Sequence, residues 1–159
     1  MPWRGRKAEL DRLHRLGLRI AYLVLRAFWF MTRPRAEGAM VAVWHEGRVL
    51  LVRNSYRRPL SMPAGNLRRG ESPAAAAVRE LREEVGITVA PERLRFAREI
   101  VHHSDWKEDH SHVFEVELAE APRIAIDQRE VVWAGFAARD EALARELSVP
   151  LRIYLESTS

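Results

Sequence analysis

The sequence predicts an α/β fold with a helical arm in front of it, and three features support this prediction. Apolar runs at residues 40–44 and 49–52 flank a short polar turn, which is typical of two largely buried strands in a hairpin. Residues 73–85 combine helix-forming alanines with helical apolar spacing. Residues 1–36 are rich in arginine, leucine and aromatic side chains, unlike the segment that follows.

The second half of the chain contains further predicted elements. Residues 113–118 alternate between apolar and charged side chains, and residues 131–136 are mostly apolar, so both are expected to be strands. Residues 140–147 and 151–155 have apolar side chains at three-to-four spacing, which indicates helices. A chain of 159 residues is long enough for one domain with a substantial core.

The predicted helix at residues 73–85 carries three closely spaced carboxylates. Glu80, Glu83 and Glu84 stand at i, i+3 and i+4, so a helix places them on one face. Like charges this close repel one another unless a cation neutralises them. An all-oxygen ligand set favours a hard divalent ion, Mg²⁺ first and Mn²⁺ second. A charge run is more commonly a solvated helix face, so the metal site depends on the residues around the triad.

The residues around the triad complete an ordered pattern. From Gly65 to Ile87 the chain fits G-x5-E-x7-R-E-U-x-E-E-x-G-U, where U is aliphatic, without a departure. This pattern resembles the Nudix box. Just before it, Ala64 departs from the Pro-Gly-Gly run that many Nudix proteins have at this place. The fixed positions between the two ends are Glu71, Arg79, Glu80, Leu81, Glu83, Glu84 and Gly86.

The resemblance implies a fold and an activity. The fold is an α/β/α sandwich with a mixed sheet, and the activity is hydrolysis of the diphosphate linkage in a nucleoside diphosphate joined to another moiety. It also implies a small phosphorylated substrate and a divalent metal cofactor. It assigns metal binding and catalysis to Glu80, Glu83 and Glu84, a further metal ligand to the carbonyl of Gly65, and supporting roles to Glu71 and Arg79.

Residues outside the box are candidates for the remaining roles. Nudix proteins often supply an extra acid from a segment well after the box, and Asp127 and Glu130 lie in such a segment. Arg53, Arg57 and Arg58 precede the box and are candidate phosphate contacts. For all five, a solvated surface charge is the alternative interpretation.

Residues 102–112 contain four histidines and two aspartates, which allows two interpretations. One is a transition-metal site, although no definite ligand spacing is present. The other is a polar loop that rims the substrate cleft between two strands. Trp106 in this segment and Tyr56 before the box are candidates for stacking on a base.

The arm at residues 1–36 is predicted to be a basic amphipathic helix, followed by a short linker at residues 34–38 and a Nudix domain at residues 37–159. On a helical projection, arginines gather on one side of the apolar segment at residues 10–31. Its apolar part, residues 16–31, is too short to cross a bilayer and is interrupted by Arg19 and Arg26, so we expect the helix to lie on an anionic membrane surface. Packing against the domain and pairing with a second chain as a homodimer are the alternatives. The arginines on this side are Arg12, Arg15, Arg19 and Arg26.

Composition limits the remaining functions. The chain has no cysteine, which excludes disulfides and thiolate chemistry and agrees with a cytoplasmic protein, peripheral at the membrane if the arm binds lipid. The net charge of +4 suits phosphorylated partners, but no nucleic-acid-binding signature accompanies it. A non-catalytic module that binds a ligand or regulates a partner is the alternative to an enzyme. The substrate within the Nudix range stays open.

Overall fold

The computed structural model describes residues 3–32, 35–104, 106–126 and 128–158. In chain order the elements are α1 (Trp3–Thr32), β1 (Arg35–His45), β2 (Arg48–Asn54), β3 (Ala64–Asn66), α2 (Pro73–Val85), the 3-10 turn η1 (Pro91–Arg93), β4 (Arg95–Ser104), β5 (Lys107–Glu117), β6 (Val131–Ala138), α3 (Arg139–Leu143) and α4 (Val149–Ser157).

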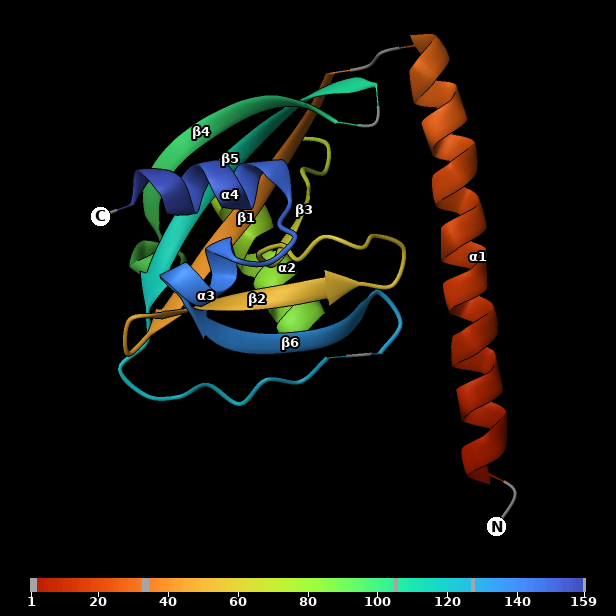
Figure 1. Ribbon diagram of the computed structural model, residues 1–159, viewed down its shortest axis with the longest axis horizontal. Helices are drawn as coiled ribbons and strands as arrows, with labels where there is room; N and C mark the ends of the chain where they lie inside the picture. The colour runs from red at the N-terminus through yellow and green to blue at the C-terminus, as the bar shows by residue number, and fades with distance from the viewer. Residues whose placement is uncertain (1–2, 33–34, 105, 127, 159) are drawn as a thin grey trace.

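The strands form one mixed sheet (Figure 1). Its order is β4-β5-β1-β2-β6, and β3 pairs with β1 beside this path. β1 runs parallel to β5 from the Arg35–Glu108 pair to the Trp44–Glu117 pair, whereas the other pairings between the described strands are antiparallel. The long β1 strand therefore lies at the centre of the sheet and brings β3, which opens the predicted box, into the sheet.

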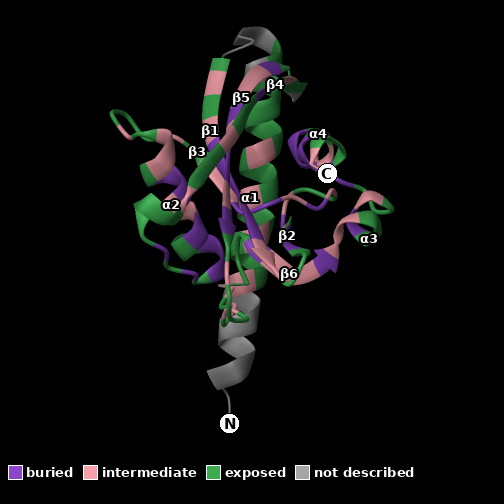
Figure 2. Cartoon of the chain, turned by 90° about the vertical axis from the view of Figure 1, so that its left-hand side faces the viewer, coloured by how far each residue is buried: buried purple, intermediate pink, exposed green. Residues whose placement is uncertain are grey.

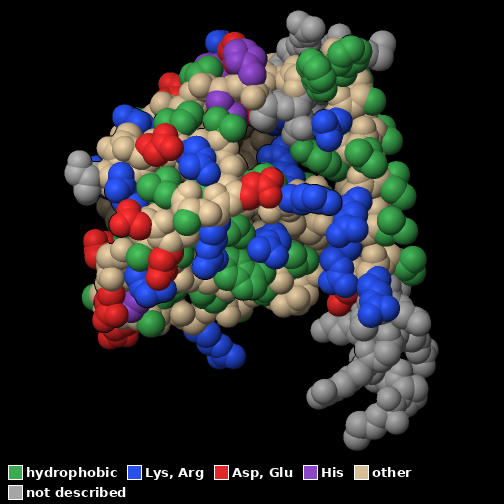
Figure 3. All heavy atoms as spheres, viewed as in Figure 1, with side chains coloured by type: hydrophobic (Ala, Val, Ile, Leu, Met, Phe, Trp, Pro, Cys, Tyr) green, Lys and Arg blue, Asp and Glu red, His purple; other side chains and the backbone are tan. Residues whose placement is uncertain are grey.

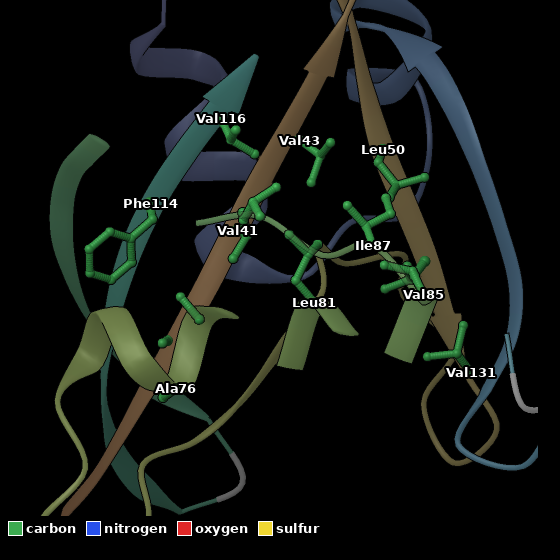
Figure 4. Close-up of a cluster of buried hydrophobic side chains, with 14 residues drawn as sticks. Val41, Val43, Leu50, Ala76, Leu81, Val85, Ile87, Phe114, Val116 and Val131 are labelled. Atoms are coloured by element: carbon green, nitrogen blue, oxygen red, sulfur yellow. The ribbon is translucent and has the colours of Figure 1, made fainter. Parts of the chain in front are cut away.

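Helices cover both faces of this sheet. Figure 2 shows α2 on one face and α3 and α4 on the other. Because successive strand residues point to opposite faces, Val41 belongs to the buried cluster that includes Leu81 of α2, shown in Figure 4. Its neighbour Ala42 belongs to the cluster that includes Leu155 of α4. The α/β/α sandwich with a mixed sheet, as predicted, is confirmed.

Local sequence explains the start and the end of α2. The Ser72 hydroxyl accepts a hydrogen bond from the Ala75 amide at 3.2 Å, and Pro73 occupies the first turn, where its missing N–H costs nothing. The helix ends at Gly86, whose φ of 72° is left-handed. These residues fix the length of α2 and therefore fix where its carboxylates stand.

The structure confirms the predicted hairpin and corrects three expectations about the remaining chain. Residues 102–112 are not a loop, because β4 and β5 pair from Arg95–Glu115 to Ser104–Lys107. The expected helix at residues 140–147 ends at Leu143, since the backbone of residues 146–148 pairs with Leu60 instead. Most of the expected linker at residues 34–38 is a strand instead, because β1 begins at Arg35.

The arm is the helix α1, which stands beside the sandwich (Figure 1). Its polar edge contacts the domain: Arg15 donates to the Gln128 carbonyl at 2.9 Å, and Arg19 donates to the Ser55 carbonyl at 3.0 Å. Its apolar face points away from the domain, as Figure 3 shows along the outer edge. The side chains of this outer face are each more than half exposed: Leu13, Leu16, Ile20, Leu23, Val24 and Phe28.

No described helix is both long enough and apolar enough to span a membrane.

Replacing Gly86 by alanine should destabilise the fold more than the same change at Gly47. Both glycines have a left-handed φ, of 72° and 70°, which costs a residue with a Cβ about 1–2 kcal/mol. Only at Gly86 would the added Cβ also meet another atom, the Cβ of Ala125 at 2.9 Å. Urea denaturation of both variants measures the difference. Equal losses of unfolding free energy would contradict the proposed crowding at Gly86.

Candidate functional site

Arg79 joins the loop after β3 to the acidic face of α2. Its side chain is only 11% exposed and forms two hydrogen bonds of 2.8 Å to the carboxylate of Glu71. It also donates to the Asn66 carbonyl at 3.0 Å, to Glu80, and to Glu83 at 3.4 Å. Charge-assisted, two-point contacts of this kind are strong and directional. One guanidinium therefore holds the loop and two carboxylates of the triad together.

The pairing with Arg79 changes the titration of its partners. The hydrogen bonds from Arg79, with one from the Arg68 amide, lower the pKa of Glu71 from 4.5 to about 2. The same contact with Glu71 raises the pKa of Arg79 above its ordinary value. Both groups therefore stay charged at neutral pH, as the supporting role implied by the resemblance requires.

Glu80 lies against the backbone of Gly65. A Cβ at position 65 would collide with the Glu80 carboxylate, so only glycine fits this position without a shift. Burial raises the pKa of Glu80 above its ordinary value, although the hydrogen bond from Arg79 opposes this. The first glycine of the box is thus needed for a close approach between backbone and carboxylate.

The other two glutamates of the triad differ in their surroundings. Glu84 is 4% exposed, and its Oε2 accepts a hydrogen bond from the Ala64 amide at 2.9 Å. Glu83 is 42% exposed and lies 3.4 Å from an Arg68 guanidinium nitrogen. The structure therefore brings the three predicted ligands to one side of α2, next to the Gly65 turn, with one carboxylate buried and one at the surface.

The donor set fits a hard divalent cation. It consists of carboxylate oxygens at i, i+3 and i+4 together with the backbone carbonyl of the adjacent Gly65, the type of ligand that Mg²⁺ and Mn²⁺ prefer. As the described side chains stand, no three His, Cys, Asp or Glu residues converge closely enough to hold a metal ion. In the triad the reason is visible, since Arg79 contacts Glu80 and Glu83 and the Ala64 amide contacts Glu84.

A cleft of about 890 Å³ opens beside the glutamates. Glu80, Glu83, Arg79 and Gly65 line one side of it. The other walls include β1, the segment after β2, the hairpin of β4 and β5, the start of α4, and α1. Of the predicted phosphate contacts, Arg57 and Arg58 line the cleft. Arg53 does not belong to the lining, because its guanidinium lies over the Trp133 ring, 5.8 Å from the ring centroid.

Glu130 is the predicted acid that lies in this cleft. Its Oε1 accepts a hydrogen bond of 3.2 Å from the Tyr56 hydroxyl, which in turn accepts one of 3.2 Å from Asn54. Burial, with a smaller effect from Glu130, raises the pKa of Tyr56 to about 12, so its hydroxyl stays a donor. The other predicted acid, Asp127, lies outside the described residues.

The histidine-rich hairpin also reaches the cleft. His102, Lys107 and Asp109 line it, and the Lys107 ammonium lies 2.6 Å from the Asp109 carboxylate, with both side chains largely buried. The described residues of this hairpin form no metal-binding group. Trp106 is not part of the lining and packs edge-on against Phe30 of α1, with ring centroids 5.1 Å apart.

The sequence interpretation missed the part of the cleft wall that α1 supplies. Tyr22 and Arg26 line the cleft from this helix. Their spacing of four residues predicts a shared helix face, but it does not predict what that face meets. Lys107 was also missed. One indication was available for Lys107: lysine is rare in this chain, which has two lysines and 24 arginines.

Replacing Glu71 by glutamine should remove a stabilisation that depends on pH. The folded pKa of Glu71, about 2, is below 4.5, so the ionised carboxylate stabilises the fold. This stabilisation is complete above about pH 4.5 and is lost as the pH falls toward 2. The difference in Tm between wild type and Glu71→Gln should therefore shrink across this window. A constant difference, or an equal effect of Glu120→Gln at an exposed position, would contradict this assignment.

Comparison with known proteins places these observations in a family. The family model of the NUDIX domain matches residues 34–155, which is most of the chain. A 55-residue segment is 44% identical to the ADP-ribose pyrophosphatase of Bacillus subtilis, covering 31% of this chain and 29% of that protein. The match thus spans less than a third of the length of this relative.

Solved structures share the fold. The MutT NUDIX hydrolase from Burkholderia pseudomallei superposes with a TM-score of 0.70 at 22% identity, covering 79% of this chain and 98% of that one. A bifunctional NMN adenylyltransferase/ADP ribose pyrophosphatase from Francisella tularensis, in complex with AMP and a manganese ion, superposes with a TM-score of 0.65 at 18% identity. This superposition covers 86% of this chain and 46% of the Francisella tularensis chain. With the complete box on α2, the sandwich and the family match over residues 34–155, this chain belongs to the Nudix family.

Proposed function

We propose that this protein is a Mg²⁺-dependent hydrolase, with Mn²⁺ as the second choice, that cleaves the diphosphate linkage of a nucleoside diphosphate joined to another moiety. One observation carries the proposal: the acidic face of α2 is intact, is fixed to the Gly65 turn, and borders a cleft large enough for a nucleotide. A family member that had lost catalysis would be expected to lose metal-binding glutamates, and this chain keeps all three.

In this proposal Glu80, Glu83, Glu84 and the Gly65 carbonyl would hold the metal. When bound, the ion neutralises phosphate charge and lowers the pKa of a coordinated water. Hydrolysis forms a bond from the water oxygen to one phosphorus, breaks the bridging P–O bond, and passes the water proton to a carboxylate. Arg79 fixes Glu80 relative to the Gly65 turn throughout.

Two carboxylates are candidates for receiving that proton. Glu80 lies against the Gly65 turn, and burial raises its pKa, which makes it a stronger base than an exposed glutamate. Glu130 lines the same cleft and is oriented by the Tyr56 hydroxyl. Glutamine variants separate the two: if Glu130 is the base, Glu130→Gln should lower kcat with little change in metal affinity. Glu80→Gln should weaken metal binding in either case, because Glu80 is also a proposed ligand, so wild-type kcat in Glu130→Gln would assign the base to Glu80.

Relatives suggest first compounds to test. The Bacillus subtilis relative is an ADP-ribose pyrophosphatase, and the Francisella tularensis structure holds AMP and manganese. ADP-ribose therefore belongs in the first panel, together with nucleoside triphosphates, nucleotide sugars and dinucleoside polyphosphates. Identity to the solved structures is low, and the match to the Bacillus subtilis protein is short. These relatives therefore support testing a panel of compounds and do not single out one substrate.

Replacing both Glu83 and Glu84 by glutamine should abolish hydrolysis while the protein stays folded. Loss of two metal ligands removes transition-state stabilisation, and we expect kcat/KM to fall by at least about a hundredfold. Phosphate release with Mg²⁺ and with EDTA measures this across the panel. The matched control is Glu156→Gln, an exposed helical glutamate on α4.

Wild-type activity in the double variant, or equal turnover in EDTA, would contradict the metal assignment. A wild-type protein that binds a panel compound with Mg²⁺ but never cleaves it would instead favour the alternative, a Nudix-fold module that binds a ligand or regulates a partner.

The outer face of α1 favours a second proposal, peripheral attachment to an anionic membrane. This face is apolar and exposed, as the six side chains described above indicate. The helix has seven basic and two acidic residues, a net charge of +5 in a chain whose total is +4. An apolar face bordered by arginines suits an interfacial helix, and each basic residue near anionic lipid contributes roughly 1 kcal/mol.

The double variant Ile20→Glu, Val24→Glu should lose vesicle binding. It places two carboxylates in the centre of the apolar face without touching the contacts of Arg15 or Arg19. Co-sedimentation with phosphatidylglycerol–phosphatidylcholine vesicles should retain wild type and release the variant, whereas pure phosphatidylcholine should bind both weakly. The control carries the same added charge at Ala119 and Ala121, in an exposed loop.

Equal binding of wild type and variant would contradict the membrane proposal. If wild type ignores vesicles and sediments as a dimer while the variant is monomeric, a second copy of the chain covers this face instead.

A further inference from the structure

We infer that α1 forms part of the substrate site: Arg26 and Arg57, which line the cleft together with Tyr22, bind a substrate phosphate other than the two that the scissile linkage joins. This inference deepens the proposed hydrolase function and rests on it. It narrows the substrate class to compounds that carry at least one further phosphate group, such as nucleoside triphosphates or dinucleoside polyphosphates.

The first support is that α1 is fixed along the cleft by contacts distributed over its length. Near its N-terminal half, Asp11 accepts a hydrogen bond of 3.3 Å from Arg129, and Arg15 and Arg19 donate to backbone carbonyls of the domain. Near its C-terminal end, Phe30 packs against Trp106 in the turn between β4 and β5. The helix is therefore positioned from both ends, and Tyr22 and Arg26, between these contacts, line the cleft.

The second support is that this middle segment lies in the same cleft as the glutamates. Tyr22 and Arg26 line the cleft together with Glu80 and Glu83. The volume of about 890 Å³ accommodates a ligand that extends beyond a diphosphate. Figure 3 shows Lys and Arg side chains gathered where α1 faces the domain. A substrate bound at α2 and longer than a diphosphate can therefore reach the helix.

The third support is the arrangement of charge around Tyr22. The Arg57 guanidinium lies 5.2 Å from the centroid of the Tyr22 ring, and its Nε donates to the Tyr22 hydroxyl at 3.1 Å. The Tyr22 ring in turn packs on Tyr56, with centroids 5.3 Å apart. Arg26 stands one helical turn from Tyr22 and lines the same cleft.

Guanidinium groups that line a cleft bind anions through charge-assisted hydrogen bonds. A phosphate oxygen is the usual partner, because a guanidinium presents a fork of N–H donors that matches it. The glutamates of α2 and the arginines beside Tyr22 thus line the cleft from different elements, and Glu130 and Asp109 also belong to the lining. The glutamates suit the metal-bridged diphosphate, and the arginines suit the additional phosphate.

Isothermal titration of the full-length protein with inorganic tripolyphosphate, in the presence of Mg²⁺, tests the inference. Arg26→Ala should weaken binding about tenfold, the effect of losing one charge-assisted contact. Tyr22→Phe, which keeps the ring but removes the acceptor for Arg57, should weaken binding less. Arg12→Ala, an exposed position on the same helix outside the cleft lining, is the matched control and should bind like wild type.

The inference fails if wild type does not bind tripolyphosphate, or if Arg26→Ala binds as tightly as wild type. It also fails if Arg12→Ala loses as much affinity, since the effect would then be net charge alone. Circular dichroism and Tm of each variant exclude unfolding as the cause, and Arg26→Lys, which retains the charge, should recover most of the affinity.

The titration does not depend on turnover, so its failure differs from failure of the proposed function. Metal-dependent hydrolysis with no effect of Arg26→Ala would overturn only the α1 subsite. For any compound that is cleaved, Arg26→Ala should raise KM and leave kcat nearly unchanged, because Arg26 contacts a phosphate remote from the reacting bond.

Discussion

The contacts of Arg79 are the interaction on which the rest of the site depends. A loop that follows a three-residue strand has little structure of its own, and an acidic helix face left to itself would repel and disperse its carboxylates. Arg79 counters both tendencies, since it binds Glu71 and the Asn66 carbonyl on the loop side and Glu80 and Glu83 on the helix side. Gly65 can then lie directly against the Glu80 carboxylate.

Around this centre the sandwich and the arm have different physical roles. The two buried clusters on either face of the sheet hold α2 in place, and among the residues whose burial is described they include none from α1. The arm is attached instead by hydrogen bonds, one ion pair and ring contacts at the edge of the cleft. Its apolar surface is turned outward. One helix therefore contributes Tyr22 and Arg26, with three apolar side chains, to the cleft wall, and it turns a second, apolar face outward.

The sequence predicted what is encoded locally. The length of α2 follows from Ser72, Pro73 and Gly86, and the triad follows from helical spacing, so both were accessible before the structure. The edge strand β4 was not predicted, because its exposed charged and histidine side chains obscure the period of two. The face of α1 that contacts the domain could not be predicted either. Helical periodicity separates the polar and apolar faces but does not say which of them meets the domain. Arg26 lines the cleft because of the way α1 packs on the domain, which the sequence alone did not predict.

The most direct test of the account is to locate the metal. Crystals of the full-length protein soaked in Mn²⁺ give an anomalous difference signal at each bound ion. The account predicts a peak within coordination distance of Glu80, Glu83, Glu84 and the Gly65 carbonyl, with Arg79 still bound to Glu71. A peak found only at the histidine-rich hairpin, or no peak beside α2 at saturating Mn²⁺, would contradict it.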